Sequence, residues 1–297
     1  MKIEQVKGNT YVIEAAELIP IYKTDEEHFI FLDTGFSWER EALDETLAEY
    51  GLTPSGVLGS HAHIDHSGNH GYYREKYGIP VAFTIGEAGM CASDCCLKGN
   101  YHMFNPNFLK DNPTYSEMVT KTDVIIDTDK EGFAFCGAEF TIVPAPGHSV
   151  DQIAVITPDN VMYVADACLT VEELSNIKIP YNLSISGVLK SLDVIERYKC
   201  DKYIFAHYGV EDELESPVKA YKEKICKVLD DIYGIIEGEM TETELIKALC
   251  EKYGMLSSNP ARTPLYFRLT KSCFDYLVDQ GRLKVTGHRG ITYYSKD

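Results

Sequence analysis

Strand-like and helix-like segments alternate along the first 85 residues of the chain. β-Branched and aromatic residues concentrate in short runs that predict strands at residues 2–6, 10–15, 28–33, 57–60 and 80–84. Two runs of good helix formers lie between them and predict helices over residues 37–50, with Ser37 as the N-cap, and over residues 67–77. This alternation indicates a mixed α/β chain.

The alternation resumes after residue 120 and ends in a long amphipathic helix. Strands are predicted at residues 122–126, 132–136, 139–143, 152–156, 161–165 and 202–206, with a helix over residues 184–198. A linking helix is predicted over residues 216–236, with Pro217 in its first turn. Its apolar residues keep a 3.6-residue period: Val218, Tyr221, Ile225, Val228, Ile232 and Ile235.

Residues 86–120 interrupt this order. They combine three cysteines and several aromatic residues with Asn, Pro and Gly, and we expect an irregular or partly helical insertion. A long insertion between strands often serves as a lid or binding loop. A surface excursion without substrate contact fits the pattern equally well.

The last part of the chain differs in charge from the rest. Residues 240–297 hold nine Lys/Arg and six Asp/Glu, a net charge of +3, so residues 1–239 carry −21 of the total of −18. This shift predicts a boundary near residue 240. Thr241 and Glu244 form a capping-box pattern for a helix over residues 241–252; a helix over residues 270–280 and a hairpin of residues 282–286 and 291–294 follow. Helices before a hairpin resemble a winged helix, which serves in packing, dimerisation or DNA binding.

Composition restricts the class of protein and its partners. The chain has 297 residues, 44% hydrophobic and 25% charged, which is typical of a globular protein rather than a disordered one. The net charge of −18 disfavours nucleic acid and anionic membrane as partners. Nine scattered cysteines without a C-x-x-C, no secretory signal and no long uncharged apolar run together predict a cytoplasmic protein with reduced thiols and no membrane contact.

The segment His61-Ala62-His63-Ile64-Asp65-His66 carries the strongest chemical signal. It places four candidate ligands within six residues, directly after a predicted strand. His61 and His63 point the same way in an extended segment, whereas Asp65 and His66 lie on the turn into the next helix, where they can face a second metal. Three further candidates each follow an apolar strand: His148, Asp166 and His207. Together they form a nitrogen and oxygen set suited to Zn²⁺, Mn²⁺ or Fe.

These residues resemble the metallo-β-lactamase-fold superfamily, over about residues 1–210. The matching pattern is H-x-H-x-D-H at residues 61–66, followed in the family's order by His148, Asp166 and His207, with Asp33-Thr34-Gly35 ahead of it. The resemblance implies an αββα sandwich, an α/β (α+β) fold of two facing sheets with helices outside. We therefore expect a metal-binding catalytic domain over residues 1–239 and a small winged-helix-like module over residues 240–297.

The resemblance also implies roles for individual residues. His61, His63 and His148 would hold one divalent ion, Asp65, His66 and His207 a second, and Asp166 would bridge them; Zn²⁺ is the preferred metal, with Fe or Mn as alternatives. A water between the two metals loses a proton and becomes the nucleophile, and Asp65 would orient it and accept a proton. Asp33 would support the ligand loop by hydrogen bonds. Tyr181 and Tyr208 are candidate contacts to a substrate oxyanion.

The glyoxalase II-like group, which includes thioester hydrolases and lactonases, is the subfamily most similar to this pattern. The leading hypothesis is thus a hydrolase of a small ester, thioester or lactone. One alternative is a mononuclear iron persulfide dioxygenase that needs only His61, His148 and Asp166. Others are a phosphodiesterase or nuclease whose C-terminal module grips nucleic acid, and a DNA-binding regulator that senses a ligand. We expect the C-terminal module to be a homodimer contact or a cover over the substrate.

Overall fold

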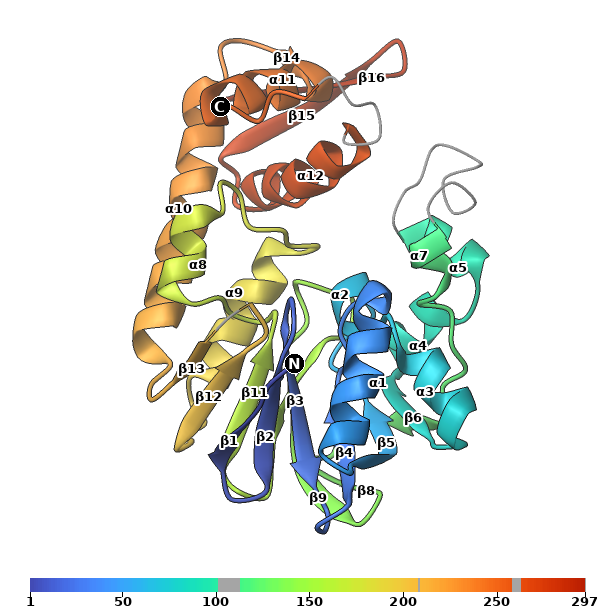
Figure 1. Ribbon diagram of the computed structural model, residues 1–297. Coiled ribbons are helices and arrows are strands. Elements are labelled where there is room, and N and C mark those ends of the chain that lie inside the picture. Colours follow the sequence, from blue (N-terminus) through green and yellow to red (C-terminus); the bar gives the residue numbers. More distant parts are fainter. Residues whose placement is uncertain (101–112, 208, 258–262, 297) are drawn as a thin grey trace.

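Two β-sheets lie face to face with helices on their outer sides (Figure 1). The computed structural model describes residues 1–100, 113–207, 209–257 and 263–296. The first sheet has the order β1-β2-β3-β4-β5-β6-β7. Its strands are β1 (Ile3–Lys7), β2 (Thr10–Glu14), β3 (Leu18–Lys23), β4 (His28–Leu32), β5 (Thr53–Leu58), β6 (Val81–Thr84) and β7 (Val124–Ile126). Strands β1 to β4 pair antiparallel, and β4 to β7 pair parallel.

The second sheet has the order β13-β12-β11-β10-β9-β8. Its strands are β8 (Gly132–Phe135), β9 (Ala138–Pro144), β10 (Ile153–Ile156), β11 (Val161–Ala165), β12 (Lys202–Phe205) and β13 (Gly209–Glu211). Only β11 and β12 pair parallel; the other neighbours are antiparallel. Between the sheets, Ile30 and Leu58 of the first belong to one buried cluster with Phe140, Val155 and Ile204 of the second. The αββα sandwich expected from the sequence is confirmed.

Helices cover the outer face of each sheet (Figure 1). On the first sheet, Leu43, Leu47 and Tyr73 from the helices pack with Phe31 and Val57 from the strands. The helical segments between β4 and β7 are η1 (Ser37–Glu39), α1 (Arg40–Glu49), α2 (Ile64–Ser67), α3 (His70–Tyr77), α4 (Ile85–Cys91), α5 (Asp94–Asn100) and α7 (Pro113–Ser116). The described part of the 86–120 insertion is therefore largely helical, whereas the sequence predicted an irregular or partly helical segment.

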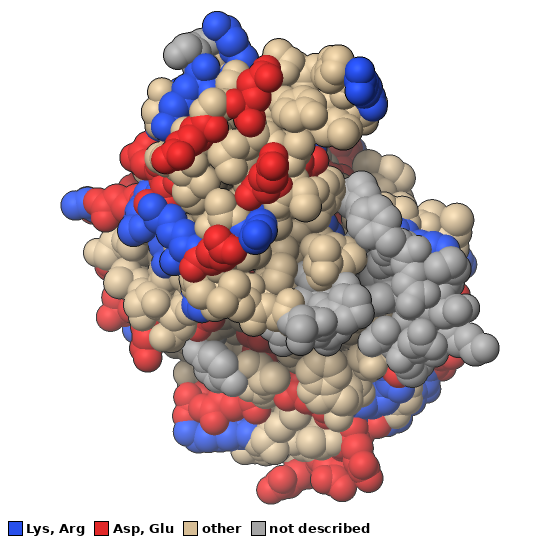
Figure 2. All heavy atoms as spheres, turned by 90° about the horizontal axis from the view of Figure 1, so that it is seen from above, with Lys and Arg blue, Asp and Glu red and all other residues tan. Residues whose placement is uncertain are grey.

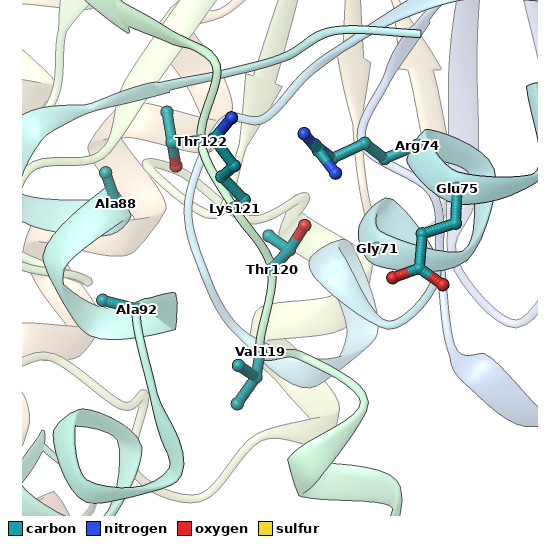
Figure 3. A pocket seen from close by; sticks show the side chains of 9 residues that line it. All are labelled: Gly71, Arg74, Glu75, Ala88, Ala92, Val119, Thr120, Lys121 and Thr122. Atoms are coloured by element: carbon teal, nitrogen blue, oxygen red, sulfur yellow. The ribbon is translucent and has the colours of Figure 1, made fainter. Parts of the chain in front are cut away.

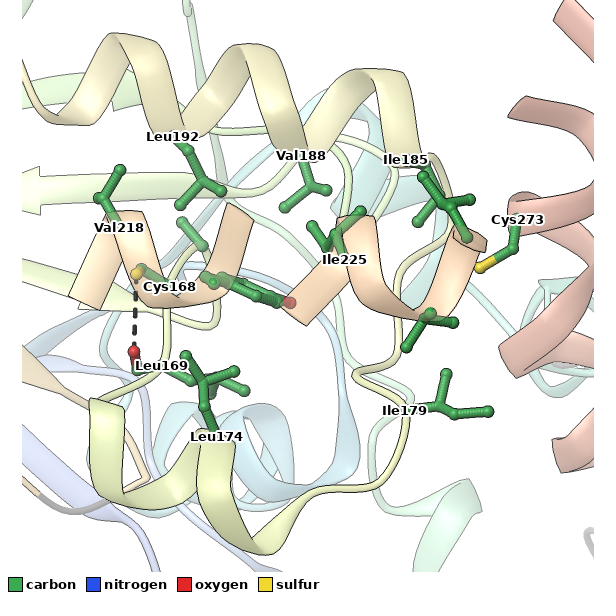
Figure 4. Close-up of a cluster of buried hydrophobic side chains, with 14 of the residues drawn as sticks. Cys168, Leu169, Leu174, Ile179, Ile185, Val188, Leu192, Val218, Ile225 and Cys273 are labelled. Carbon is green, nitrogen blue, oxygen red and sulfur yellow. Dashed lines mark hydrogen bonds between the residues drawn. The ribbon is translucent and has the colours of Figure 1, made fainter. Parts of the chain in front are cut away.

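The outer face of the second sheet is covered by α8 (Val171–Asn176), α9 (Ile185–Ile195) and α10 (Glu215–Ile235). Figure 4 shows Val188 and Leu192 of α9 and Val218 and Ile225 of α10 pointing toward one another in this cluster. All but the last of the six periodic positions predicted for the linking helix are among the buried residues of α10. The 3.6-residue spacing of apolar residues therefore predicted the buried face of α10 correctly.

The C-terminal segment packs on this same cluster. It contains β14 (Met240–Thr241), α11 (Glu242–Tyr253), α12 (Thr263–Asp279), β15 (Leu283–His288) and β16 (Ile291–Lys296), with the sheet order β14-β16-β15. Cys273 of α12 lies beside α9 and α10 in this cluster (Figure 4). Phe274 and Leu277 of α12 belong to the same buried cluster. The capping box of Thr241 and Glu244 is confirmed. A domain boundary near residue 240 and a winged-helix module remain predictions.

Three predictions need correction. Ser37 is not an N-cap: η1 begins at Ser37 after Phe36, α1 begins at Arg40 after Glu39, and neither has a side-chain cap hydrogen bond. Strand β3 was missed because Pro20 interrupts its apolar run, yet the ladder with β4 begins only at Ile21, so Pro20 needs no N–H donor on that side. Helix α12 begins at Thr263 rather than at residue 270, because Pro264 occupies the first turn, where its missing N–H costs nothing. Within the described ranges, no helix has both the length and the apolar character needed to cross a membrane.

Candidate metal centre

The histidine segment, residues 61–66, follows the carboxyl end of β5, at the edge of the first sheet that is formed by strand ends. Gly59 and Ser60 lead from β5 to the buried His61, and His63 is the N-cap of α2, which carries Asp65 and His66. A Cβ on Gly59 would lie 2.1 Å from the ring of Phe83. Only glycine fits there, so the residue allows the ligand loop to pass close to the neighbouring strand.

The other three candidate ligands follow strands of the second sheet. His148 comes after β9, Asp166 directly after β11, and His207 two residues after β12. Strands β9 and β11 are both antiparallel to β10, and β12 is parallel to β11, so the three strands run in one direction. Their carboxyl ends therefore meet at one edge, which faces the histidine segment. The structure brings all seven predicted ligands together there.

Three histidines form the first group. Nδ1 of His63 lies 3.0 Å from Nε2 of His61 and 2.9 Å from Nε2 of His148. A proton on Nδ1 could serve only one of these two neighbours, so it would leave the other close contact without a hydrogen bond. Burial, followed by the neighbouring imidazoles, lowers the pKa of His61 and His63 well below the usual histidine range. Neutral imidazoles with converging lone pairs are the form that binds a metal ion.

Asp65, His66, Asp166 and His207 form the second group. Nε2 of His66 lies 3.2 Å from Oδ1 of Asp166, and Nε2 of His207 lies 3.2 Å from Oδ2 of Asp166. Asp166 also reaches the first group, since its Oδ2 lies 3.3 Å from Nε2 of His148. Burial would raise the pKa of Asp166, but His207, His66 and His148 hold it well below the usual range. The carboxylate is therefore an ionised acceptor between the two groups.

Oxygen atoms on the far side of three histidine rings determine which ring nitrogen carries the hydrogen. Nδ1 of His148 lies 3.1 Å from the carbonyl oxygen of Tyr181, and Nδ1 of His66 lies 2.9 Å from Oδ2 of Asp33. Nδ1 of His207 lies 2.8 Å from Oε2 of Glu17. These oxygens only accept, so each Nδ1 carries a hydrogen, and the ring in its neutral form would present the lone pair of Nε2 to the site.

The donor set fits divalent metal ions. Nε2 of His66 and Oδ1 of Asp166 are buried atoms without a hydrogen-bond partner in the described chain. Buried polar atoms that lack a partner normally bind something else, and this set of nitrogen and oxygen atoms suits a cation. Burial opposes the charged form of His207, but Asp166 and then Glu17 raise its pKa to about 11, which shows how strongly the acids attract positive charge at this point.

Asp33 stands directly behind the ligand loop. Its backbone adopts a φ of 67°, a region that non-glycine residues rarely occupy. Oδ1 accepts a hydrogen bond from the backbone N–H of Ser60 at 2.7 Å, and Oδ2 accepts one from the Tyr163 hydroxyl at 2.8 Å. The carboxylate thus connects the ligand loop, His66 and the second sheet.

A cavity of about 250 Å³ opens onto the two groups. His63, Asp65, His148, Asp166 and His207 line it. Its remaining walls come from the chain that follows β11 and from α10: Leu169, Ile177, Tyr181 and Tyr221. Tyr181, a predicted substrate contact, therefore lies beside the site; Tyr208, the other one, lies outside the described residues.

A larger cavity, of about 380 Å³, lies away from this cluster, between α3, α4 and the segment before β7 (Figure 3). Arg74 and Lys121 line it, but both approach Asp123 outside it, at 2.7 Å and 3.4 Å. The Asp123 carboxylate neutralises the basic groups of this cavity, and we assign no chemistry to the cavity.

Sequence reasoning missed three residues around the site. Glu17 lies between β2 and β3, and it carried no signal because β3 itself was not predicted. Tyr163 is buried in β11, where a tyrosine is indistinguishable from a packing residue. Arg268 lies on α12 and lines a hollow together with His63 and His148, a contact between segments far apart in the chain.

Comparison with known proteins places this geometry in a family. A family model described as the metallo-beta-lactamase superfamily matches residues 4–207. Metallo-beta-lactamase domain-containing protein 1 of Rattus norvegicus is 35% identical over 77 residues, 25% of this chain and 26% of the rat protein. The protein named Probable metallo-hydrolase YqgX of Bacillus subtilis (strain 168) is 31% identical over 100 residues, 34% of this chain and 41% of that protein. The matches thus span less than half of these relatives.

Solved structures share the fold over nearly the whole chain. A metallo-beta-lactamase family protein of Thermus thermophilus superposes with a TM-score of 0.76 at 18% identity, covering 97% of this chain and 99% of that one. A beta-lactamase domain protein of Burkholderia ambifaria superposes with a TM-score of 0.77 at 16% identity, covering 100% and 94%. Together with the match over residues 4–207, the fold and the clustered histidines and aspartates establish that this chain belongs to the metallo-beta-lactamase superfamily.

Proposed function

We propose that this protein is a dinuclear metal-dependent hydrolase that cleaves a small ester, thioester or lactone. The observation that carries the proposal is the place of Asp166, whose carboxylate lies within 3.3 Å of imidazole nitrogens from both groups. Two divalent ions on its two sides would act as Lewis acids and lower the pKa of a water between them. Zn²⁺ suits these ligands best, with Fe or Mn as alternatives.

We assign proton transfer to Asp65. Its side chain is 19% exposed, against 6% for Asp166, and it lines the cavity, so it meets both water and substrate. Oδ2 lies 3.8 Å from Nε2 of His66 and 3.9 Å from Nε2 of His207. From this place the carboxylate can orient the attacking water by a hydrogen bond, accept its proton and return it to the leaving group.

The cavity supports a small substrate. About 250 Å³ holds a compact molecule, and the apolar Leu169 and Ile177 beside the charged ligands suit an acyl chain next to a scissile carbonyl. On the face shown in Figure 2, basic and acidic side chains stand next to each other rather than in separate areas. In the C-terminal segment, Lys271 pairs with Asp275, and Arg282 pairs with Asp230 of α10. Such a surface gives little attraction for a polyanion.

Metal content and a substrate screen on one sample test the proposal. The metal-loaded protein is offered lactones, thioesters, esters and phosphodiesters, with and without oxygen. We expect two metal ions per chain and oxygen-independent hydrolysis of a small acyl substrate. One iron per chain with oxygen uptake would replace the proposal by a dioxygenase, and cleavage of phosphodiesters alone would replace it by a nuclease.

Variants connect the result to the site. His61→Ala and Asp166→Ala should each abolish turnover and lower the bound metal. His28→Ala is the matched control, because His28 is an exposed histidine whose ring pairs with Asp25 at 3.0 Å, outside the metal centre. Full activity in either site variant would refute the assignment.

A further inference from the structure

A buried carboxylate connects the two loops that carry the first group of histidines. Glu87 lies in the first turn of α4 and is fully buried. Its Oε2 accepts a hydrogen bond from the backbone N–H of Ala62 at 2.8 Å, and its Oε1 accepts one from the backbone N–H of Asp151 at 2.8 Å. Ala62 belongs to the histidine segment, whereas Asp151 belongs to the loop of residues 145–152, between β9 and β10, which carries His148. One side chain therefore bonds to both loops.

Helix α4 gives this carboxylate a fixed support. Met90 and Cys91, one turn after Glu87, are buried in the cluster on the outer face of the first sheet. The 145–152 loop contacts the start of the same helix. Oδ2 of Asp151 accepts a hydrogen bond from the N–H of Gly86 at 3.0 Å, and the Asp151 carbonyl oxygen accepts one from the Thr84 hydroxyl at 2.8 Å. The loop is thus attached to a helix that is itself packed on the sheet.

Three hydrogen-bond donors surround the Glu87 carboxylate. Burial raises its pKa, and the hydrogen bonds from Asp151, Ser149 and Ala62 counteract this rise. Because these groups donate to the carboxylate, they favour its ionised form. Ser149 directly follows His148, so this bond also holds the 145–152 loop.

Only the first group takes its ligands from both loops. His61 and His63 come from the histidine segment, and His148 comes from the 145–152 loop. The second group contains no residue of the 145–152 loop. The separation of the two loops therefore sets the distance between His148 and the other two histidines, and Nε2 of His148 lies 2.9 Å from Nδ1 of His63.

We infer that Glu87 is a positioning residue, which holds the two loops at the separation that the first metal position requires. Its two oxygens accept from both backbone N–H groups at once. A glutamine of the same size accepts with one oxygen only, and its NH₂ group would face the other N–H. The inference rests on the proposed metal-dependent function and concerns the placement of the ligands rather than the reaction.

Zinc titration of Glu87→Gln with a competing chelator tests the inference. The first position should lose about 10- to 100-fold in affinity, as is typical when a group that orients metal ligands is removed. The second position should bind as in the wild type. His148→Ala and His207→Ala identify the two binding steps, because each removes a ligand of one group only. Unchanged affinity at the first position, or an equal loss at both positions, would overturn the inference.

Asp159→Asn is the matched control for a purely structural role. Oδ2 of Asp159 accepts from the backbone N–H of Asn9 at 2.7 Å and from the Thr10 hydroxyl at 2.9 Å, so this carboxylate also connects two segments. It follows β10, which runs opposite to β9 and β11, and therefore lies at the edge away from the metal centre. The variant should lower the Tm and leave both zinc affinities unchanged.

Gly86→Ala disturbs the same contact without removing the carboxylate, and it keeps the test decisive if Glu87→Gln does not fold. An added Cβ would lie 2.6 Å from the Cβ of Asp151, so the 145–152 loop must move away from α4. Zinc affinity should again fall at the first position. Gly89→Ala, in the same helix, is the control, because its added Cβ meets nothing within 4 Å. Equal affinities in the two alanine variants would count against the inference.

Hydrogen exchange in the metal-free protein separates this inference from the proposed function. The amides of Ala62 and Asp151 should exchange slowly in the wild type, and Glu87→Gln should accelerate at least one of them by about tenfold, as expected for a lost hydrogen bond to a charged group. If the protein binds no metal, the proposed function fails, and this measurement still decides whether Glu87 holds the two loops. Equal exchange rates in the two proteins would overturn that role whatever the metal content.

Discussion

Oε2 of Glu17 lies 2.8 Å from Nδ1 of His207. The two residues are far apart in the sequence, but a backbone hydrogen bond from the N–H of Leu18 to the carbonyl of Ala206, at 2.8 Å, ties the turn between β2 and β3 to the end of β12. The first sheet thus supplies a carboxylate that orients a candidate ligand of the second. A carboxylate behind a ligating histidine fixes the ring and makes it a stronger base.

Removing the charge of Glu17 should weaken the second metal position. For Glu17→Gln we expect about 10- to 100-fold loss of metal affinity or activity, because a neutral amide polarises the His207 ring less than a carboxylate does. Metal titration with a competing chelator measures the affinity. Glu14→Gln, at an exposed residue of β2, is the control and should bind metal like the wild type. Unchanged affinity in Glu17→Gln would show that the contact does not serve the ion.

Asp33→Asn and Asp33→Ala separate backbone strain from charge. Asn tolerates the positive φ of this position better than Ala, so the Ala variant should be the less stable of the two. Both lose the carboxylate that accepts from Tyr163 and Ser60, at a cost of about 1–3 kcal/mol for unsatisfied buried groups. Both should also bind metal more weakly, because Nδ1 of His66 loses its charged partner. Urea unfolding and metal titration test this; an Asn variant as stable as the wild type would contradict it.

Gly147→Ala should disturb the site through the backbone. Gly147 has a φ of +137°, and an added Cβ would lie 2.2 Å from the backbone nitrogen of Val188. The adjacent His148 must move or α9 must shift, and we expect a loss of stability of about 2–4 kcal/mol together with weaker metal binding. Gly89→Ala in α4 is the control: nothing lies within 4 Å of its added Cβ, so its stability should equal or slightly exceed that of the wild type. Similar melting temperatures for the two variants would refute this.

Asp231 should make stability depend on pH in acid. Burial would raise its pKa, but hydrogen bonds from Lys227, Tyr253 and Lys252 lower it from 3.8 to about 2. Because the pKa of Asp231 is lower in the folded than in the unfolded protein, its ionised carboxylate adds to the free energy of unfolding. This contribution is complete above about pH 4 and disappears as the pH falls through 2. Asp231→Asn should therefore cost about 1–2 kcal/mol at pH 7 and progressively less as the pH falls to 2.

Urea unfolding across this pH range provides the measurement. Asp230→Asn is the control, since Asp230 is 69% exposed in its pair with Arg282 and should contribute less than about 0.5 kcal/mol. A difference between wild type and Asp231→Asn that stays constant from pH 7 to pH 2 would contradict the assigned origin of the effect.

Much of the site could be anticipated because its residues obey local rules. The four candidate ligands of residues 61–66 are close together in sequence, and Asp166 and His207 follow buried apolar strands. Strands that run in the same direction end at the same edge of a sheet. Residues that directly follow such strands are therefore expected to lie close together in space. The missed strand β3 shows the limit of such rules, because Pro20 is acceptable there only through the register with β4.

The order of residues along the chain was thus sufficient to predict the seven residues that meet at the edge of the sheets, and the resemblance of that order to the metallo-β-lactamase superfamily predicted the sandwich fold. Tertiary structure alone decided which groups stand behind and beside them: Glu17 on His207, Tyr163 on Asp33, and Arg268 on Tyr181. The physical reason is that each of these contacts joins separate strands or helices. Their partners are selected by packing between the layers and not by any periodicity within one element.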